Sequence, residues 1–180
     1  MNITDFTFKP LSTSTDLSNF DCGDLDINDF LIIDALSYQE QRMANTYLFF
    51  DDPTQQIVAY FSASSDNLKS ETFENRTWNR LHRKTKIPNP KRIRNYPSVK
   101  VGRLGINSLF HKKGLGSQLL DFIKVWIFRD AQIANRFILV DAYNKASVVE
   151  FYQKNDFTLL LSDDVEDNTR LMYFDLMRLV

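Results

Sequence analysis

Residues 98–121 read SVKVGRLGINSLFHKKGLGSQLLD, and this stretch decides the fold. Its first part, SVKVGRLGI, is rich in β-branched and apolar residues and predicts a strand. From Leu115 onward, apolar residues fall at positions 115, 119, 122 and 126, which is helical spacing. The first helical amides, from about Lys112 to Ser117, then have no intrahelical partners. Two glycines and two lysines suit this turn to a phosphate or pyrophosphate.

Two common nucleotide-binding motifs are missing from this stretch. It contains no G-x-x-x-x-G-K-[ST], which excludes a P-loop, and no G-x-G-x-x-G, which excludes a dinucleotide fingerprint. Taken alone, Gly-Leu-Gly at a helix start is equally explained as a simple capped turn. The rest of the chain has to decide between the two interpretations.

Composition predicts a single folded domain over residues 1–180. Hydrophobic residues make up 43% of the chain, with 15 Phe and 7 Tyr, which excludes a disordered protein. The single cysteine, Cys22, excludes an intramolecular disulfide framework and a multi-cysteine metal site. The start MNITDFTFKP has no signal pattern, and no apolar run approaches the roughly 20 residues that span a membrane. We therefore expect a cytoplasmic protein without a membrane anchor.

Positive charge is concentrated between Arg76 and Arg94. This segment holds eight Lys or Arg and no acid, whereas the rest of the chain holds 14 Lys or Arg against 23 acids. Such a distribution is expected of a site for a polyanion such as RNA, and a solvated loop is the alternative. Trp78 and Leu81 can anchor one helical turn, and the prolines at 88, 90 and 97 predict a long loop around it.

The remaining segments predict alternating strands and helices. We expect a strand at 4–10, one long or two short helices at 24–44 capped by Asp24 or Asp26, and a hairpin of 46–52 with 55–64. The opening strand has a parity switch that predicts a bulge near Gly102 to Gly105, or else a central strand covered on both faces. A buried parallel strand at 136–142, a helix at about 145–154 capped by Asn144, and a closing hairpin around Asp163 to Asp167 follow.

Two motifs in this order resemble the GNAT superfamily of N-acetyltransferases. GRLGI followed by HKKGLG resembles its acyl-CoA motif, Arg/Gln-x-x-Gly-x-Gly/Ala, with His111 at the first position. VDAYNKASVVEFYQKNDF resembles the later segment with Asn-x-x-Ala and Phe-Tyr-x-x-x-x-Phe. The resemblance implies a mixed, mostly antiparallel sheet of about six to seven strands, flanked by helices, with a central strand-helix-strand acyl-CoA site. Its helices at 24–44 would border the acceptor cleft.

The resemblance also implies residue roles. Tyr152 would be catalytic and meet the leaving thiolate. Acetyl-CoA would be bound by Leu104, Gly105, Ile106, His111, Lys112, Lys113, Gly114, Leu115, Gly116, Ser117 and Asn144. From the residues alone, Tyr152 is equally a core aromatic and Asn144 equally a helix cap. No metal site is expected, because His82 and His111 are isolated in the sequence.

Reference pKa values limit what Tyr152 can do. With about 10 for a tyrosine and about 8.5 for a thiol, full proton transfer is uphill by about 2 kcal/mol. Tyr152 is therefore expected to act by hydrogen bonding or by concerted transfer. The base that deprotonates the amine is not evident, and Asp141, Glu40 or a water are the alternatives.

Within the superfamily, FDCGDLDINDFL, TYLFF, GRLGI and VDAYNKAS resemble the compact toxins of toxin–antitoxin modules. This resemblance implies aminoacyl-tRNA as acceptor and an antitoxin as protein partner. The positive charge from Arg76 to Arg94 would bind the tRNA, and a homodimer is a further expectation. The alternatives are a small-molecule or peptide N-acetyltransferase, and a non-catalytic module that binds CoA or RNA.

Overall fold

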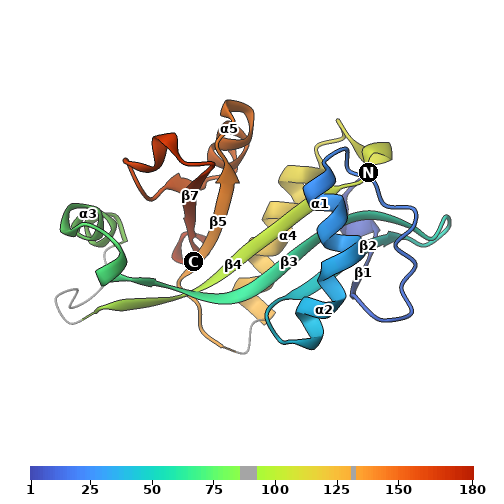
Figure 1. Ribbon diagram of the computed structural model, residues 1–180, viewed down its shortest axis with the longest axis horizontal. Coiled ribbons are helices and arrows are strands. Elements are labelled where there is room, and N and C mark those ends of the chain that lie inside the picture. Colours follow the sequence, from blue (N-terminus) through green and yellow to red (C-terminus); the bar gives the residue numbers. More distant parts are fainter. Residues whose placement is uncertain (86–92, 131–132) are drawn as a thin grey trace. The chain divides into compact units, whose positions relative to one another are not determined.

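The computed structural model describes residues 1–85, 93–130 and 133–180. Its strands are β1 (Thr7–Pro10), β2 (Asn45–Asp51), β3 (Gln56–Lys69), β4 (Asn95–Ile106), β5 (Phe137–Tyr143), β6 (Thr158–Leu159) and β7 (Thr169–Asp175). Its helices are α1 (Leu25–Asp29), α2 (Ala35–Glu40), α3 (Asn75–Thr85), α4 (Leu115–Asp130) and α5 (Ala146–Lys154) (Figure 1). Short helical segments are η1 (Ile3–Asp5), η2 (Phe30–Asp34), η3 (Ser70–Thr72), η5 (Ser108–Phe110), η6 (Asp164–Glu166) and η7 (Leu176–Leu179).

The strands form a seven-stranded sheet in the order β1-β2-β3-β4-β5-β7-β6. β4 and β5 pair in parallel, whereas the pairs β1–β2, β2–β3, β5–β7 and β6–β7 are antiparallel. The predicted mixed, mostly antiparallel sheet is therefore confirmed, and so is the strand-helix-strand unit made by β4, α4 and β5.

The chain forms two compact units. One comprises Met1–Ser64 with Val101–Ile123, and the other comprises Ser65–Lys100 with Lys124–Val180. β3, β4 and α4 contribute residues to both units, and each unit is described below by itself. The single domain over residues 1–180 stays a prediction.

The first unit has helices on both faces of its strands (Figure 1). On one face, Leu31 and Ala35 of the η2–α2 helix pack in a core with Leu48, Ile57 and Tyr60 of the strands. On the other face, the Phe122 ring of α4 lies edge-on to the rings of Phe8 and Phe49, at 4.9 and 5.0 Å between centroids. Burial of these aromatic and aliphatic side chains supplies the main stabilisation of the unit.

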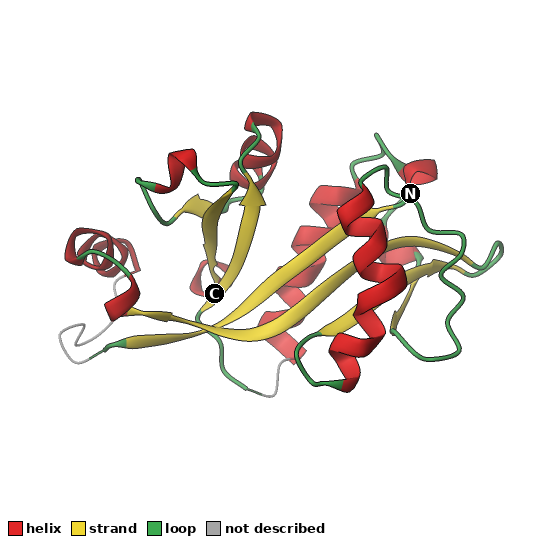
Figure 2. Cartoon of the chain, viewed as in Figure 1, coloured by secondary structure: helices red, strands yellow, loops and turns green. Residues whose placement is uncertain are grey.

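The predicted helix at 24–44 is one continuous helical path, as Figure 2 shows. Asp24 is its N-cap, because its side chain accepts a hydrogen bond from the amide of Ile27 at 3.3 Å. The middle, η2, is a π-helix in which the amide of Ala35 donates to the carbonyl of Phe30. π-Helical turns are rare and often occur near functional sites.

In the second unit, the core lies between α3, the strands and the chain after β6. It contains Trp78 and Leu81 of α3, Tyr96 of β4, Phe137 of β5 and Tyr173 of β7, together with Leu68, Leu139 and Leu160. The Phe137 ring lies edge-on to both Tyr96 and Tyr173, at 5.4 and 5.6 Å between centroids. This cluster fixes α3 on the strands of its unit.

The prediction of a long loop with one helical turn at 76–94 is wrong for its first half. α3 is an 11-residue helix, because Thr77, Trp78, Leu81 and Thr85 form a buried stripe at helical spacing. The prolines at 88 and 90 come only after this stripe and do not interrupt it. The loop predicted at 86–92 lies outside the described residues.

Candidate functional site

The end of β4, after Lys100, does not pair with β5 among the described residues. The parallel ladder with β5 runs only from Ser98 to Lys100. Beyond it, the amides of Arg103 and Asn107 donate toward β3, to Ser62 Oγ at 3.0 Å and Val58 O at 2.9 Å. Because the amides of a strand alternate between its edges, those of Leu104 and Ile106 point the other way. These two amides are available to a ligand.

Gly105 has a different role from its two neighbours. An added Cβ would lie 3.0 Å from both Ile27 Cγ2 and Tyr60 Cε1, and 3.1 Å from Phe20 Cζ. The absence of a side chain therefore lets α1 and two aromatic rings pack against β4. The alternation of amides directs the N–H of Gly105 toward β3, so its predicted contact with a ligand has no support from this geometry.

The connection from β4 to α4 is held by side chains. Asn107 is 2% exposed, and its Nδ2 donates to the carbonyls of Asn19 and Ile57, both at 3.0 Å. The ring of His111 donates from Nε2 to the carbonyl of Ile106 at 2.7 Å. Sequence reasoning missed Asn107, although an Asn directly after a strand is a turn signal.

The start of α4 is a run of unpartnered amides. No backbone N–H from Lys112 to Ser117 donates a hydrogen bond to any described residue, and Gly114 has no side chain to cap the helix. Lys112 and Gly114 have left-handed φ values of 60° and 73°, and such turns can direct neighbouring amides at a common anion. The helix dipole and Lys112 and Lys113 add positive charge there. The side chain of Leu115 is buried in the core, so that of the predicted ligand residues in this turn Leu115 can contact a ligand only through its backbone.

Tyr152 lies on α5 in the second unit. Its ring contacts the rings of Phe151 and Phe157, both at 5.4 Å between centroids. Its hydroxyl makes no hydrogen bond to any residue that the structure describes. Burial among its neighbours raises the pKa of Tyr152 to about 12. The phenol is therefore a neutral donor at physiological pH.

The prediction of Asn144 as the helix N-cap is wrong. α5 has Lys145 at its N-cap, without a capping side chain. The Asn144 side chain instead donates from Nδ2 to the carbonyls of Val165 at 2.6 Å and Asp167 at 2.8 Å. Asn144 thus ties the end of β5 to the acidic loop before β7. Its amide nitrogen is committed to these bonds, and contact with a ligand is left to its carbonyl oxygen.

The two candidate bases differ in their surroundings. The carboxylate of Asp141 forms an ion pair with the ammonium group of Lys100. Glu40 is an exposed residue at the end of α2. Neither is a desolvated carboxylate of the kind that serves as a general base near neutral pH. Among the described residues, no group of three His, Cys, Asp or Glu is arranged to hold a metal ion.

Solved structures of other proteins share this fold. AtaT complexed with acetyl-methionyl-tRNAfMet superposes with a TM-score of 0.76 at 21% identity, over 97% of this chain and 97% of AtaT. A tyrosine-to-phenylalanine mutant of KacT gives 0.76 at 20% identity, over 97% and 99%. A tyrosine-to-phenylalanine mutant of the AtaT toxin, bound to the C-terminus of the antitoxin AtaR and acetyl-CoA, gives 0.72 at 20%, over 97% and 95%.

The chain has the GNAT fold. The resemblance in the sequence motifs is thereby confirmed at the level of the fold. No protein-family model matches the chain. None of the described helices is both long and apolar enough to cross a membrane. At these identities the likeness establishes the architecture, and the activity is a separate question.

Proposed function

We propose that the protein is an acetyl-CoA-dependent N-acetyltransferase whose acceptor is the amino group of aminoacyl-tRNA. The observation that carries the proposal is the run of unpartnered amides from Lys112 to Ser117 at the start of α4. Support comes from the matching fold of AtaT, whose structures hold acetyl-methionyl-tRNAfMet in one case and acetyl-CoA in another.

The residues of the first unit fit the nucleotide half of acetyl-CoA. The amides from Lys112 to Ser117 would bind the pyrophosphate, with Lys112 and Lys113 adding charge. His111 would position this turn through its bond to Ile106, since its Nε2 is already used there. The edge amides of Leu104 and Ile106 would bind the pantetheine arm and the thioester oxygen.

The residues of the second unit fit the reacting end. Tyr152 would donate a hydrogen bond to the thiolate as it leaves. With its pKa at about 12 and a thiol near about 8.5, full proton transfer from the phenol costs about 5 kcal/mol. Tyr152 would therefore stabilise the thiolate as a donor and would not give up its proton first. Because Asp141 is ion-paired, we propose that water takes the proton from the amine.

Acetyl transfer to charged tRNA with the purified protein tests the proposal. Replacing Tyr152 by Phe removes a bond to a charged group, and turnover should fall about 10- to 100-fold while acetyl-CoA affinity stays within about twofold. Tyr47→Phe, a half-buried tyrosine of β2, is the matched control and should retain wild-type turnover. Equal losses of affinity and turnover in Tyr152→Phe would assign Tyr152 to the core.

The amide run is tested by calorimetry with acetyl-CoA. Gly114→Ala forces a side chain onto a φ of 73° and should weaken binding about tenfold. Gly23→Ala carries the same strain at a φ of 81°, outside this turn, and should bind normally. If Gly114→Ala bound acetyl-CoA as tightly as the wild type, the amides would not hold the coenzyme.

The acceptor and the partner are tested separately. We propose a cytoplasmic toxin that an antitoxin neutralises; in one of the matching structures the AtaT toxin is bound to the C-terminus of the antitoxin AtaR. Expression should arrest growth, and co-expression of the adjacent gene product should restore it. Harmless expression with acetylation of polyamines or peptides would favour a different N-acetyltransferase. Binding of acetyl-CoA without turnover on any amine would favour a non-catalytic module, and light scattering would test the expected homodimer.

A further inference from the structure

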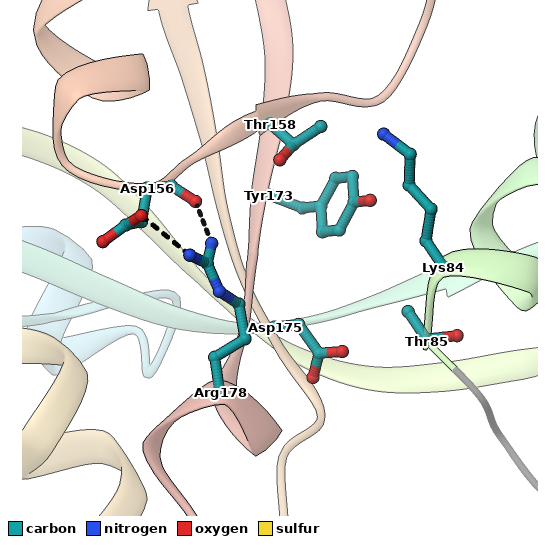
Figure 3. Close-up of a pocket in the computed structure, with 7 residues that line it drawn as sticks. All are labelled: Lys84, Thr85, Asp156, Thr158, Tyr173, Asp175 and Arg178. Atoms are coloured by element: carbon teal, nitrogen blue, oxygen red, sulfur yellow. Dashed lines mark hydrogen bonds and ion pairs between the residues drawn. The ribbon is translucent and has the colours of Figure 1, made fainter.

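A polar cavity lies beside the C-terminal end of α3 in the second unit. It has a volume of about 150 Å³ and is lined by Lys84, Thr85, Asp156, Thr158, Tyr173, Asp175 and Arg178 (Figure 3). A buried water needs only about 10–15 Å³ of the same measure. The cavity is therefore large enough for an ion such as phosphate together with some of its water.

Three donors in this cavity have no partner within the part of the chain that the structure describes. The Lys84 ammonium group and the hydroxyls of Thr158 and Tyr173 make no hydrogen bond or ion pair with any described residue. Figure 3 shows the side chains of Lys84, Thr158 and Tyr173 next to one another, with the Tyr173 hydroxyl on the side of Lys84. Tyr173 is 6% exposed as a residue, and its side chain lines the cavity. These three groups can therefore donate to a ligand that enters the cavity.

The carboxylates of the cavity are already neutralised. Asp156 accepts from Arg178 at 2.7 Å, and the same arginine also donates to the Asp156 carbonyl at 2.9 Å. Asp175 accepts from Arg136 Nη2 at 2.8 Å and from the amide of Met177 at 3.0 Å. Each acid thus has its own arginine, and the charge of Lys84 is left over. Arg136 does not line the cavity, but counting it with the lining residues leaves one positive charge in excess, beside the neutral hydroxyl donors.

We propose that this cavity binds a phosphate group, with Lys84 supplying the charge and Tyr173 and Thr158 supplying hydroxyl donors. A phosphate has enough acceptor oxygens for all three donors, and charge-assisted bonds to it are the strong ones. Free phosphate esters and the backbone phosphate of an RNA present the same chemistry. The proposal does not depend on acetyl transfer, because binding can be measured without acetyl-CoA.

Calorimetry with inorganic phosphate, with AMP and with a short RNA hairpin tests the proposal. The wild type should bind phosphate or AMP at one site. Lys84→Met, which keeps the length of the side chain, should weaken this binding at least about tenfold. Tyr173→Phe, which removes one hydroxyl donor, should weaken it about fivefold. The matched control Lys69→Met removes an exposed lysine elsewhere in the unit and should bind as the wild type does.

The RNA arm identifies the source of the phosphate. If Lys84→Met weakens the hairpin as it weakens inorganic phosphate, the natural ligand is an RNA backbone phosphate. If hairpin binding is unchanged, the ligand is a free phosphate ester. Thermal unfolding of each variant shows whether it is folded, and Tyr173→Phe still reports if Lys84→Met is not. Binding of none of the three probes, or binding that neither Lys84→Met nor Tyr173→Phe weakens, would overturn the proposal.

Discussion

The His111 ring donates from Nε2 to the carbonyl oxygen of Ile106 at 2.7 Å, across the connection between β4 and α4. In HKKGLG, His111 stands where the acyl-CoA motif that this stretch resembles has Arg or Gln. Its bond closes the connection onto the end of the strand, next to the amides from Lys112 to Ser117. We infer that this residue positions the turn instead of contacting the coenzyme through its ring.

Removing the imidazole should therefore loosen the turn. A hydrogen bond of this kind contributes about 0.5–1.5 kcal/mol, so His111→Ala should weaken acetyl-CoA binding about 2- to 10-fold. His111→Gln retains an N–H donor and should stay within about twofold of the wild type. Calorimetry with acetyl-CoA measures both. Equal losses of acetyl-CoA affinity in the two variants would mean that the imidazole ring itself is needed, and not only its N–H donor.

The close packing around Gly105 predicts a loss of stability on adding one methyl group. Gly105→Ala places a Cβ 3.0 Å from Tyr60 and Ile27, and should lower the free energy of unfolding by about 1–3 kcal/mol. The control Gly102→Ala meets only the Ser62 hydroxyl, at 3.3 Å, and should cost less. Urea unfolding of both variants makes the comparison. A smaller loss for Gly105→Ala than for Gly102→Ala would contradict the packing argument.

The raised pKa of Tyr152 predicts a dependence of stability on alkaline pH. In the unfolded chain its pKa is about 10, whereas in the folded protein it is about 12. Below pH 10 both forms keep the proton, so stability is unaffected. Between these values only the unfolded chain releases the proton, and stability falls by at most about 1.4 kcal/mol per pH unit, less because Tyr152 is partly exposed.

Urea unfolding at about pH 9 and about pH 11 measures this fall. Tyr152→Phe has no proton to release and should lose less stability over the same range. The difference between the two proteins isolates Tyr152 from the other tyrosines. If the wild type and Tyr152→Phe lost the same stability over this range, the Tyr152 phenol would be hydrated in the folded protein and its pKa would not be raised.

Asp164 anchors the acidic loop before β7. Its side chain accepts from Arg170 Nε at 2.6 Å and from the amide of Leu171 at 3.0 Å, and the residue is 4% exposed. Removing one partner of a buried ion pair costs about 3–5 kcal/mol. Asp164→Ala should show a loss of this order in urea unfolding. The exposed neighbour Asp163 should tolerate the same change within about 0.5 kcal/mol, and equal losses would refute the assignment.

The basic face of α3 predicts salt-dependent RNA binding. Arg76 and Arg83 are exposed, and neutralising both should lower the slope of log affinity against log salt by about 2. Filter binding of a tRNA across a salt series measures the slope. Lys9→Gln with Lys69→Gln removes two exposed charges elsewhere as a control. An unchanged slope in the arginine variant would leave α3 without a role in RNA binding.

Structural features that depend on residues close together in the sequence could be predicted from it. The strand, turn and helix of residues 98–121 follow from local periodicity, and so does the buried parallel strand β5. Asn144 could not be assigned, because its partners Val165 and Asp167 are more than 20 residues away. The length of α3 was missed because prolines were weighed above the buried stripe of Trp78 and Leu81. The phosphate cavity draws on α3 and the chain around β6 and β7, and no local pattern marks it.

The π-helical turn η2 should allow the first unit to lose one residue without losing its fold. Its bond from Ala35 to Phe30 encloses one more residue than an α-helical turn does. Deleting one exposed residue, Ile32 or Ile33, can convert this π-helical turn into an ordinary α-helical turn. The hydrogen bonds of the helix on either side would persist. Relatives that differ by one residue between Phe30 and Ala35 can therefore share the same architecture, and length variation in this helix is expected to concentrate there.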